Sequence, residues 1–281
     1  MHKFKGCVAV VTGAGSGIGR QLAYQLADAG AQLAISDIVA NSLQDTLQEV
    51  IRRGAKVEAT VLDVADQAAI FDYATSVEQQ FGKINLVINN AGVALSSGPL
   101  WTTSIEDFKW LMDINLYGVL YGTKAFLPIL EKASWGHIVN VSSIFGIIAV
   151  PNQTAYNASK FAVRGLTEAL RQELKIAGSA VSCTSVHPGG IKTNIANSAR
   201  WVDSGKSNAA KQHSSALADF DKLARTSPES AAAQILKAVK NNKRRLLIGA
   251  DAKFVDLIQR FMPSHYAWFI SKWLGDTVNK I

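Results

Sequence analysis

Strand-like and helix-like segments alternate along this chain from its first ten residues, and this alternation restricts the possible folds more than any other feature. Strands that are separated by helices pair in parallel through right-handed crossovers. Apolar runs without polar alternation indicate a sheet that is covered on both faces. The expected strands are residues 8–11, 32–36, 57–62, 86–88, 137–141, 180–186 and 246–248. The expected helices are residues 19–29, 43–51, 66–81, 105–130, 155–176 and one that begins at 227–229.

This order predicts a doubly wound α/β fold, with a parallel sheet of about seven strands and helices on both faces. The chain has 281 residues, of which 48% are hydrophobic, so it can bury a large core as a single domain. Sheets of this kind bind ligands beyond the carboxyl ends of their strands. The most informative motifs of the sequence fall at those strand ends, which predicts a functional site at that edge of the sheet.

A glycine-rich loop, TGAGSGIG, ends the first expected strand at residues 12–19. Glycines let the backbone approach a pyrophosphate closely, and the helix that follows directs free N–H groups and its positive dipole end at an anion. The spacing is TGxxxGxG rather than GxGxxG, because the last glycine of GxGxxG, counted from Gly13, would fall on Ile18. The loop indicates a dinucleotide cofactor; an ordinary tight turn is the alternative.

Asp37 ends the second expected strand. A carboxylate at this place can accept hydrogen bonds from both hydroxyls of an adenosine ribose, and it would repel a 2′-phosphate. No Arg or Lys flanks Asp37 in the sequence, and position 16 is Ser rather than a basic residue. The sequence therefore predicts NAD rather than NADP. Asp63 and Val64 follow the third strand, where they would meet the adenine ring.

Three further strand ends and helices carry candidate catalytic groups: Asn115, Ser142 with Ser143, and the pair Tyr156 and Lys160. The last two are four residues apart at a helix start and share a face. Free tyrosine has a pKa of about 10, and a general base for neutral pH needs about 7, a difference of about 4 kcal/mol. One positive charge about 4 Å away at an effective dielectric constant of about 20 supplies roughly 4 kcal/mol. Lys160 can therefore activate Tyr156, although an exposed surface pair has the same spacing.

Together these motifs resemble the short-chain dehydrogenase/reductase family in its ordinary single-domain form. The resemblance covers roughly residues 5–250 and implies a Rossmann-type fold and an NAD-dependent enzyme acting on CH–OH groups. It rests on the TGxxxGxG loop, Asp63, the Asn89-Asn90-Ala91-Gly92 run, Asn115, Ser143, Tyr156-x-x-x-Lys160 and Pro188-Gly189.

The resemblance implies a role for each catalytic residue. Tyr156 would donate or remove the proton of the substrate hydroxyl, and Lys160 would hold the nicotinamide ribose and lower the pKa of Tyr156. Ser143 would hydrogen-bond the substrate oxygen. Asn115 would support a water that links Lys160 to solvent. Ser142 is the alternative to Ser143, but only Ser143 has the family's spacing to Tyr156.

The residues that this resemblance and the loop positions imply for cofactor binding lie on several strand ends. Residues 89–92 would line the adenosine ribose, and Ile191 and Thr193 would hold the nicotinamide carboxamide. The full set is Gly13, Ser16, Gly17, Ile18, Gly19, Asp37, Asp63, Val64, Asn90, Ala91, Gly92, Tyr156, Lys160, Pro188, Gly189, Ile191 and Thr193. No metal is expected, because the five histidines show no metal-ligand spacing.

Residues 193–226 have no clean periodicity and are expected to form a substrate lid within a catalytic domain over 1–250. Apolar residues from this segment and from neighbouring loops would line a pocket for a hydrophobic secondary alcohol or ketone. They are Ile195, Ala196, Trp201 and Leu217, with Val93, Leu95, Ile144, Phe145, Val150 and Gln153. The substrate itself, its stereochemistry and the preferred direction do not follow from the sequence.

The remaining residues, 251–281, form an apolar and basic C-terminal extension. The formal charge of residues 1–191 is −1 (14 basic, 15 acidic), whereas that of 192–281 is +8 (15 basic, 7 acidic). An oligomer contact or a cover for the pocket explains the apolar tail most simply, and peripheral membrane contact is the alternative. No nucleic-acid motif accompanies the charge, so no nucleic-acid partner is expected.

The family resemblance also implies a homodimer or homotetramer, paired through helices 105–130 and 155–176. The chain start shows no secretory signal, so a cytoplasmic protein is expected. Two other functions fit the sequence less well. A nucleotide-binding regulator without turnover would lack Tyr156 or Lys160, and both are present. An epimerase or dehydratase of the extended branch would be longer and would have another glycine spacing.

Overall fold

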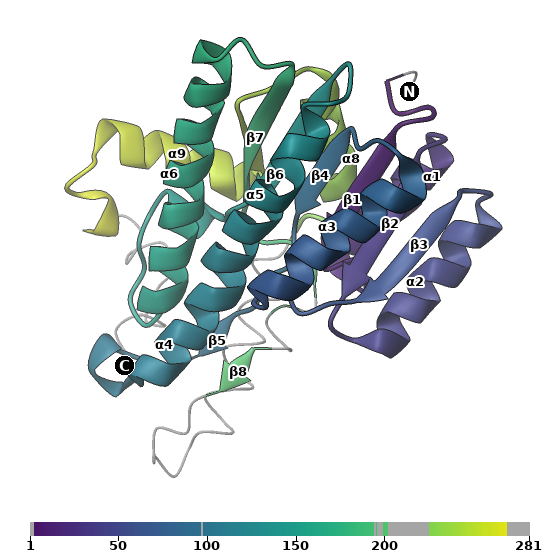
Figure 1. The fold of residues 1–281 in the computed structure, drawn as a ribbon. Coiled ribbons are helices and arrows are strands. Elements are labelled where there is room, and N and C mark those ends of the chain that lie inside the picture. Colours follow the sequence, from purple (N-terminus) through teal and green to yellow (C-terminus); the bar gives the residue numbers. More distant parts are fainter. Residues whose placement is uncertain (1–2, 97, 194, 196–198, 202–224, 269–281) are drawn as a thin grey trace.

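Seven parallel strands form one sheet in the order β3-β2-β1-β4-β6-β7-β9 in the computed structural model, which describes residues 3–96, 98–193, 195, 199–201 and 225–268. Every neighbouring pair is parallel, which confirms the predicted doubly wound sheet (Figure 1). The strands are β1 (Val8–Thr12), β2 (Gln32–Asp37), β3 (Val57–Val61), β4 (Leu86–Asn89), β6 (Gly136–Val141), β7 (Val181–Pro188) and β9 (Arg245–Ile248). The strand order reverses between β1 and β4, where such sheets bind ligands.

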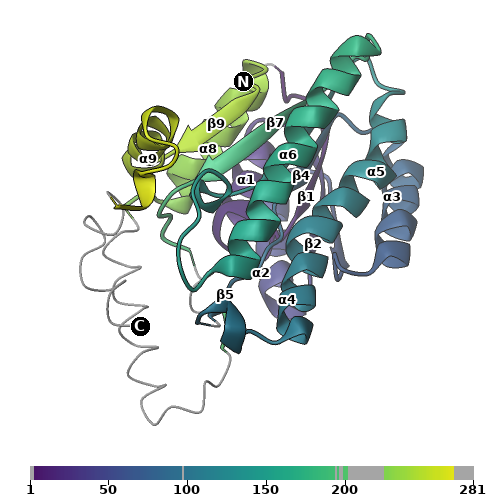
Figure 2. The ribbon, with the colours of Figure 1, turned by 90° about the vertical axis from the view of Figure 1, so that its left-hand side faces the viewer.

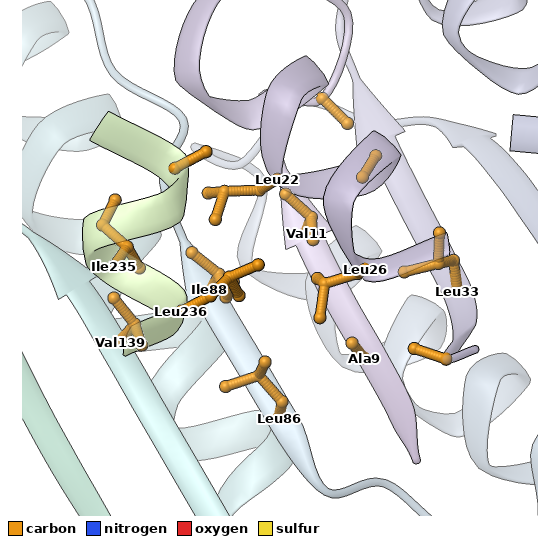
Figure 3. Close-up of a cluster of buried hydrophobic side chains, with 14 of the residues drawn as sticks. Ala9, Val11, Leu22, Leu26, Leu33, Leu86, Ile88, Val139, Ile235 and Leu236 are labelled. Atoms are coloured by element: carbon orange, nitrogen blue, oxygen red, sulfur yellow. The ribbon is translucent and has the colours of Figure 1, made fainter. Parts of the chain in front are cut away.

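Helices cover both faces of this sheet, as the sequence predicts. One face carries α1 (Gly17–Asp28), α2 (Ala40–Arg52) and α8 (Pro228–Lys240). The other carries α3 (Gln67–Phe81), α5 (Gly118–Leu130) and α6 (Thr154–Ile176), which lie in front of the sheet in Figure 1. Leu22 and Leu26 of α1 pack with Ile235 of α8 over the central strands (Figure 3). Burial of this apolar surface is the main stabilising contribution to the fold.

The long helix expected over residues 105–130 is interrupted. It consists of α4 (Ile105–Met112), a π-helical turn (Asp113–Tyr117) and α5. The π turn contains Asn115, whose amide bonds to the backbone of Val93. Such single wide turns are frequent at functional sites. Helical periodicity continues through the turn, so the sequence pattern does not reveal it.

A small sheet of two strands and two 3₁₀ turns lie near the expected pocket, and the sequence predicted none of them. A second, two-stranded parallel sheet pairs β5 (Leu95–Ser96) with β8 (Arg200–Trp201). Two 3₁₀ turns cover Leu100–Thr102 and Ile144–Gly146. Most of the expected lid, including Ala196 and Leu217, lies outside the described residues.

The C-terminal extension begins with α9 (Ala250–Phe261), which ends just before Pro263 as expected. It contacts β9 and the 3₁₀ turn Ile144–Gly146, at the edge of the sheet (Figure 2). The expected tail residues from Phe269 onward lie outside the described residues. Among the helices that the structure does describe, none is long and apolar enough to cross a bilayer.

Candidate active site

The glycine-rich loop joins β1 to α1 at the carboxyl edge of the sheet, and its glycines are required there. Gly13 and Gly17 have φ values of +65° and +51°, which L-residues rarely adopt. A Cβ on Gly19 would lie 2.6 Å from Asn90 Nδ2 and would overlap the Gly13 carbonyl. The Ser16 side chain does not cap α1, so the first N–H groups of the helix are free for an anion.

Asn90 and Ala91, which follow β4, fasten a second loop to the first. Asn90 Nδ2 donates to the carbonyls of Thr12 (3.0 Å) and Gly13 (3.2 Å). The Thr12 hydroxyl accepts from the backbone N–H groups of Asn90 and Ala91, both at 3.1 Å. Deeper in the sheet, Asn89 Nδ2 donates to Asn140 Oδ1 at 2.8 Å. The run therefore steadies the centre of the sheet, and it holds the glycine-rich loop in one conformation.

Asp37 lies beneath the same loop. Its two carboxylate oxygens accept from the backbone N–H groups of Gly15 (2.8 Å) and Val39 (2.9 Å). The guanidinium of Arg20 donates to the carbonyls of Gly15 and Ser42. No basic residue flanks Asp37 in sequence, but the fold brings Arg20 to the same end of the loop. This cation is a feature of the site that the sequence argument missed.

Asp63 and Val64 follow β3. Asp63 Oδ1 accepts from the backbone N–H of Ala65 at 2.9 Å, so the carboxylate closes its own turn. Val64 is buried, and a Cβ on Gly118 would approach its Cγ2 to 2.8 Å. Val64 thus packs against the start of α5, and the structure places both residues at the edge where the glycine-rich loop lies.

Lys160 is buried in α6, and it lies close to the other expected catalytic residues. Its Nζ donates to the carbonyl of Val141 at 3.2 Å and lies 5.5 Å from the centroid of the Tyr156 ring. Burial lowers the pKa of Lys160 to about 8. A Cβ on Gly92 would lie 3.4 Å from this Nζ and 3.1 Å from Asn115 Oδ1, so the glycine leaves room between the two side chains.

Asn115 is fully buried, and its amide is engaged on both sides. Oδ1 accepts from the N–H of Val93 (2.8 Å), and Nδ2 donates to the carbonyl of Val93 (2.9 Å). Nδ2 also approaches Ser159 Oγ at 3.5 Å. The side chain therefore fixes the loop after β4 against α6, next to Lys160.

The Tyr156 hydroxyl lies near the Ser143 side chain, and the ring meets Phe145 edge to face at 6.0 Å. Burial raises the pKa of Tyr156, and the nearby Ser143 side chain opposes this rise. This differs from the expectation that Lys160 lowers the pKa. The difference arises because removal of the phenolate from water has the largest effect on this pKa.

The two serines that end β6 point in different directions. Ser142 Oγ donates to the carbonyl of Lys160 at 2.8 Å, so it binds the backbone of α6. Ser143 Oγ accepts from the N–H of Phe145 at 3.1 Å and lies near the Tyr156 hydroxyl. The structure thus brings Ser143, and not Ser142, to the Tyr156 hydroxyl.

His187, at the end of β7, supports Ser143 from behind and was not singled out from the sequence. The imidazole is fully buried; Nδ1 pairs with the Ser143 carbonyl at 3.0 Å and Nε2 with Ser185 Oγ at 2.9 Å. Burial lowers the pKa of His187 to about 4, so the ring is neutral near pH 7. The only available signal was its position directly before Pro188-Gly189.

The segment after β7 folds back over the glycine-rich loop. Ile191 pairs with Thr226, and the Thr193 N–H donates to the Ile191 carbonyl at 2.7 Å. A Cβ on Gly17 would lie 3.1 Å from Thr193 Cγ2. Gly17, which is expected at the cofactor's diphosphate, and Thr193, which is expected at its nicotinamide carboxamide, therefore lie side by side.

Apolar side chains border Tyr156 in two clusters. Val93 and Leu95 pack with Tyr156 beside α4, while Ile144, Phe145 and Val150 pack with Ile147 and Ile148. Ala196 and Leu217 lie outside the described residues, as does the side chain of Trp201. No three His, Cys, Asp or Glu side chains in the described parts of the chain form a group that could hold a metal ion.

Comparisons with known proteins identify relatives of this chain. The Mycobacterium tuberculosis protein SadH, described as an oxidoreductase, is 45% identical over 95% of this chain and 94% of its own. The cyclohexanol dehydrogenase of Acinetobacter sp. is 37% identical, over 69% of this chain and 76% of that one. A short chain dehydrogenase/reductase from Burkholderia phymatum, solved in complex with NAD, superimposes with a TM-score of 0.84 at 30% identity, over 93% and 95% of the two chains.

The family model described as short chain dehydrogenase matches residues 7–202, which contain β1 through β8 and all four expected catalytic residues. The chain therefore belongs to the short-chain dehydrogenase family and is an oxidoreductase of that type.

Proposed function

We propose that this protein interconverts a hydrophobic secondary alcohol and its ketone, with NAD(H) as cofactor and Tyr156 as general acid and base. The observation that carries the proposal is the group formed by the partly buried Tyr156 and the buried Ser143 and Lys160. The Tyr156 hydroxyl lies near the Ser143 side chain, and Lys160 lies behind the ring without a carboxylate partner within the described residues. A buried, unneutralised lysine is costly for stability, which is typical of a functional residue.

The residues at the sheet edge fit a dinucleotide. A loop that leaves no room for side chains at Gly13, Gly17 and Gly19, at an uncapped helix start, suits a diphosphate. Asp37 would accept from the hydroxyls of the adenosine ribose, and Ile191 with Thr193 would meet the nicotinamide end. A bound nicotinamide would supply the acceptor or donor of the hydride.

The side chains of the protein would handle the proton. In ketone reduction Tyr156 gives its hydroxyl proton to the substrate oxygen, and in alcohol oxidation it takes that proton back. Ser143 donates a hydrogen bond to the same oxygen and stabilises the charge that develops there. Lys160 would hold the ribose hydroxyls through its ammonium group, which is present below about pH 8.

A hydrophobic substrate follows from the side chains around Tyr156. Val93 and Leu95 pack with Tyr156, Phe145 meets its ring edge to face, and the carboxylate of Asp107 pairs with Arg200. The name of the Acinetobacter relative, a cyclohexanol dehydrogenase, supports a cyclic or branched secondary alcohol.

The assembly and compartment are also proposals. Tyr117, next to α5, and Phe161, on α6, are large apolar side chains that remain about 40% exposed, which suits a helix-paired homodimer or homotetramer. Cys7 and Cys183 are buried free thiols, as expected in the reducing cytoplasm. Light scattering coupled to gel filtration would give the mass directly.

The test is absorbance of NADH at 340 nm over a panel of secondary alcohols and ketones, in parallel with NADPH, for the wild-type protein and Tyr156→Phe. We expect turnover with NAD(H), and none for the variant, although it still binds NADH. Wild-type protein that binds NADH by calorimetry without turnover on the whole panel would favour a nucleotide-binding protein that is not an enzyme. Appreciable turnover by Tyr156→Phe would exclude Tyr156 from the proton transfer.

A further inference from the structure

We propose that Asp251, in the first turn of α9, is a positioning residue for the nicotinamide half of the cofactor. The proposal rests on the proposed function, because that function assigns the segment Pro188–Thr193 to the nicotinamide. It makes the first turn of the C-terminal extension part of the active site.

The contact that carries the proposal joins the last helix to the segment after β7. Asp251 Oδ2 accepts a hydrogen bond from the backbone N–H of Gly190 at 2.7 Å. The preceding N–H, that of Gly189, donates to the Ile248 carbonyl at 2.9 Å. Both consecutive amides are therefore held by the β9–α9 junction, and one of the two bonds is made to a charged acceptor, which strengthens it.

The glycines around Asp251 indicate that the chain leaves space specifically for its carboxylate. A Cβ on Gly189 would overlap the Asp251 carboxylate, and so would a Cβ on Gly249. Gly189 has no positive φ, so its backbone conformation suits any residue. Glycine is needed at position 189 because the carboxylate occupies the space of a side chain.

The opposite side of the segment is fastened by Thr226. Its carbonyl accepts from the N–H of Lys192 (2.9 Å), and its N–H donates to the carbonyl of Gly190 (3.3 Å). Gly190 is thus bonded on one side to Asp251 and on the other to Thr226. These bonds fix the chain one residue before Ile191, whose backbone is expected to meet the carboxamide.

A purely structural role makes a different prediction. An acidic residue in the first turn stabilises a helix through the helix dipole, wherever its oxygens point. Such a role would affect unfolding but would not distinguish two ligands of the same site. A positioning role affects only ligands that carry a nicotinamide.

The experiment is calorimetric titration of NADH and of ADP-ribose, which lacks the nicotinamide, into wild-type protein and four variants. For Asp251→Ala we expect the Kd for NADH to rise about tenfold, as for one lost charge-assisted hydrogen bond, and that for ADP-ribose to change less than about twofold. Asp251→Asn keeps an acceptor oxygen and should recover most of the NADH affinity. Gly189→Ala, which displaces the carboxylate without removing it, should behave like Asp251→Ala and serves if that variant does not fold.

Asp256→Asn is the matched control, because Asp256 lies on the same helix and pairs with Arg245 at 2.6 Å, away from the segment. It should lower Tm and leave the ratio of the two affinities unchanged. Equal effects of Asp251→Ala on NADH and ADP-ribose, or no effect on either, would overturn the role of Asp251. Wild-type protein that binds neither ligand would overturn the proposed cofactor instead, and the positioning role with it.

Discussion

The hydroxyl of Ser142 donates to the backbone carbonyl of Lys160 at 2.8 Å, and so ties the end of β6 to the helix that carries the catalytic pair. A Cβ on Gly146 would overlap this bond, which shows how closely strand and helix approach. Two adjacent serines therefore have separate tasks. Ser142 fixes the position of Lys160, whereas Ser143 reaches the hydroxyl of Tyr156.

Mutations can separate the roles of Ser142 and Ser143. Ser143→Ala removes a hydrogen bond to the reacting oxygen, and we expect kcat to fall by about 10²- to 10³-fold with little change in Tm. Ser142→Ala leaves a buried carbonyl with one partner fewer, and should lower the free energy of unfolding by about 1 kcal/mol while kcat falls less than about tenfold. Urea denaturation and steady-state kinetics on both variants check this. A larger kcat loss for Ser142→Ala than for Ser143→Ala would reverse the assignment.

Asp37 should determine which cofactor is used. Asp37→Ala removes the acceptor for the ribose hydroxyls and the charge that repels a 2′-phosphate, so we expect NAD to bind about tenfold more weakly and NADP more tightly. The Arg20 guanidinium, already at this loop, would then attract the phosphate. The double variant Asp37→Ala/Arg20→Leu should lose the gained NADP affinity. Fluorescence titrations with NADH and NADPH measure both effects, and unchanged preference in Asp37→Ala would refute the ribose argument.

The sheet and the glycine-rich loop could be predicted because each depends on a short stretch of chain. Apolar runs give the strands, and a loop between strand and helix gives the anion-binding end. Tyr156 and Lys160 share a helix face by spacing alone, so the proximity of their side chains could also be predicted. The raised pKa of Tyr156 was not, since burial depends on the whole surrounding structure.

Contacts between distant residues account for what the sequence did not reveal. Asp251 binds Gly190 across 61 positions and Arg20 binds Ser42 across 22. The two-residue strands β5 and β8 are too short to have a periodicity. Asn115 in the π turn bonds to Val93, 22 positions away, and the helical pattern passes through the turn unchanged.

Arg200 should affect substrate binding through the small sheet. The side chain of Arg200 makes two contacts: Nε lies 3.2 Å from Asp107 Oδ1, and the guanidinium lies over the Trp110 ring at 5.1 Å. The backbone N–H of Arg200 donates to the carbonyl of Ala94 at 3.1 Å. Removing the side-chain contacts costs about 1 kcal/mol. For Arg200→Ala we therefore expect KM for the alcohol to rise roughly fivefold.

The cofactor should be unaffected, because these contacts lie beside β5 and α4, away from the glycine-rich loop. The Kd of NADH is the internal check for Arg200→Ala. Arg53→Ala, which removes an ion pair between Arg53 and Glu49 on α2, is the control for loss of a surface cation. An unchanged KM in Arg200→Ala would show that β8 does not help to form the substrate site.

Acid should destabilise the protein through two buried imidazoles. Burial lowers the pKa of His187 to about 4 and that of His137 to about 3, from an ordinary value of about 6.5. Between pH 6.5 and pH 4 the unfolded chain binds protons on both rings and the folded chain does not. The free energy of unfolding therefore falls as the pH falls through this window, by roughly 3 kcal/mol for His187 alone.

The variant His187→Asn isolates the contribution of His187 to this pH dependence. It lacks a titrating ring, so its stability deficit relative to wild type should be largest at pH 7 and shrink as the pH approaches 4. Urea midpoints at pH 7, 5.5 and 4.5 measure this, and His265→Asn, at an exposed histidine, serves as control. A deficit that stays constant with pH would mean that His187 keeps an ordinary affinity for protons in the folded state. In that case burial would not keep the ring that pairs with the Ser143 carbonyl uncharged between pH 6.5 and pH 4.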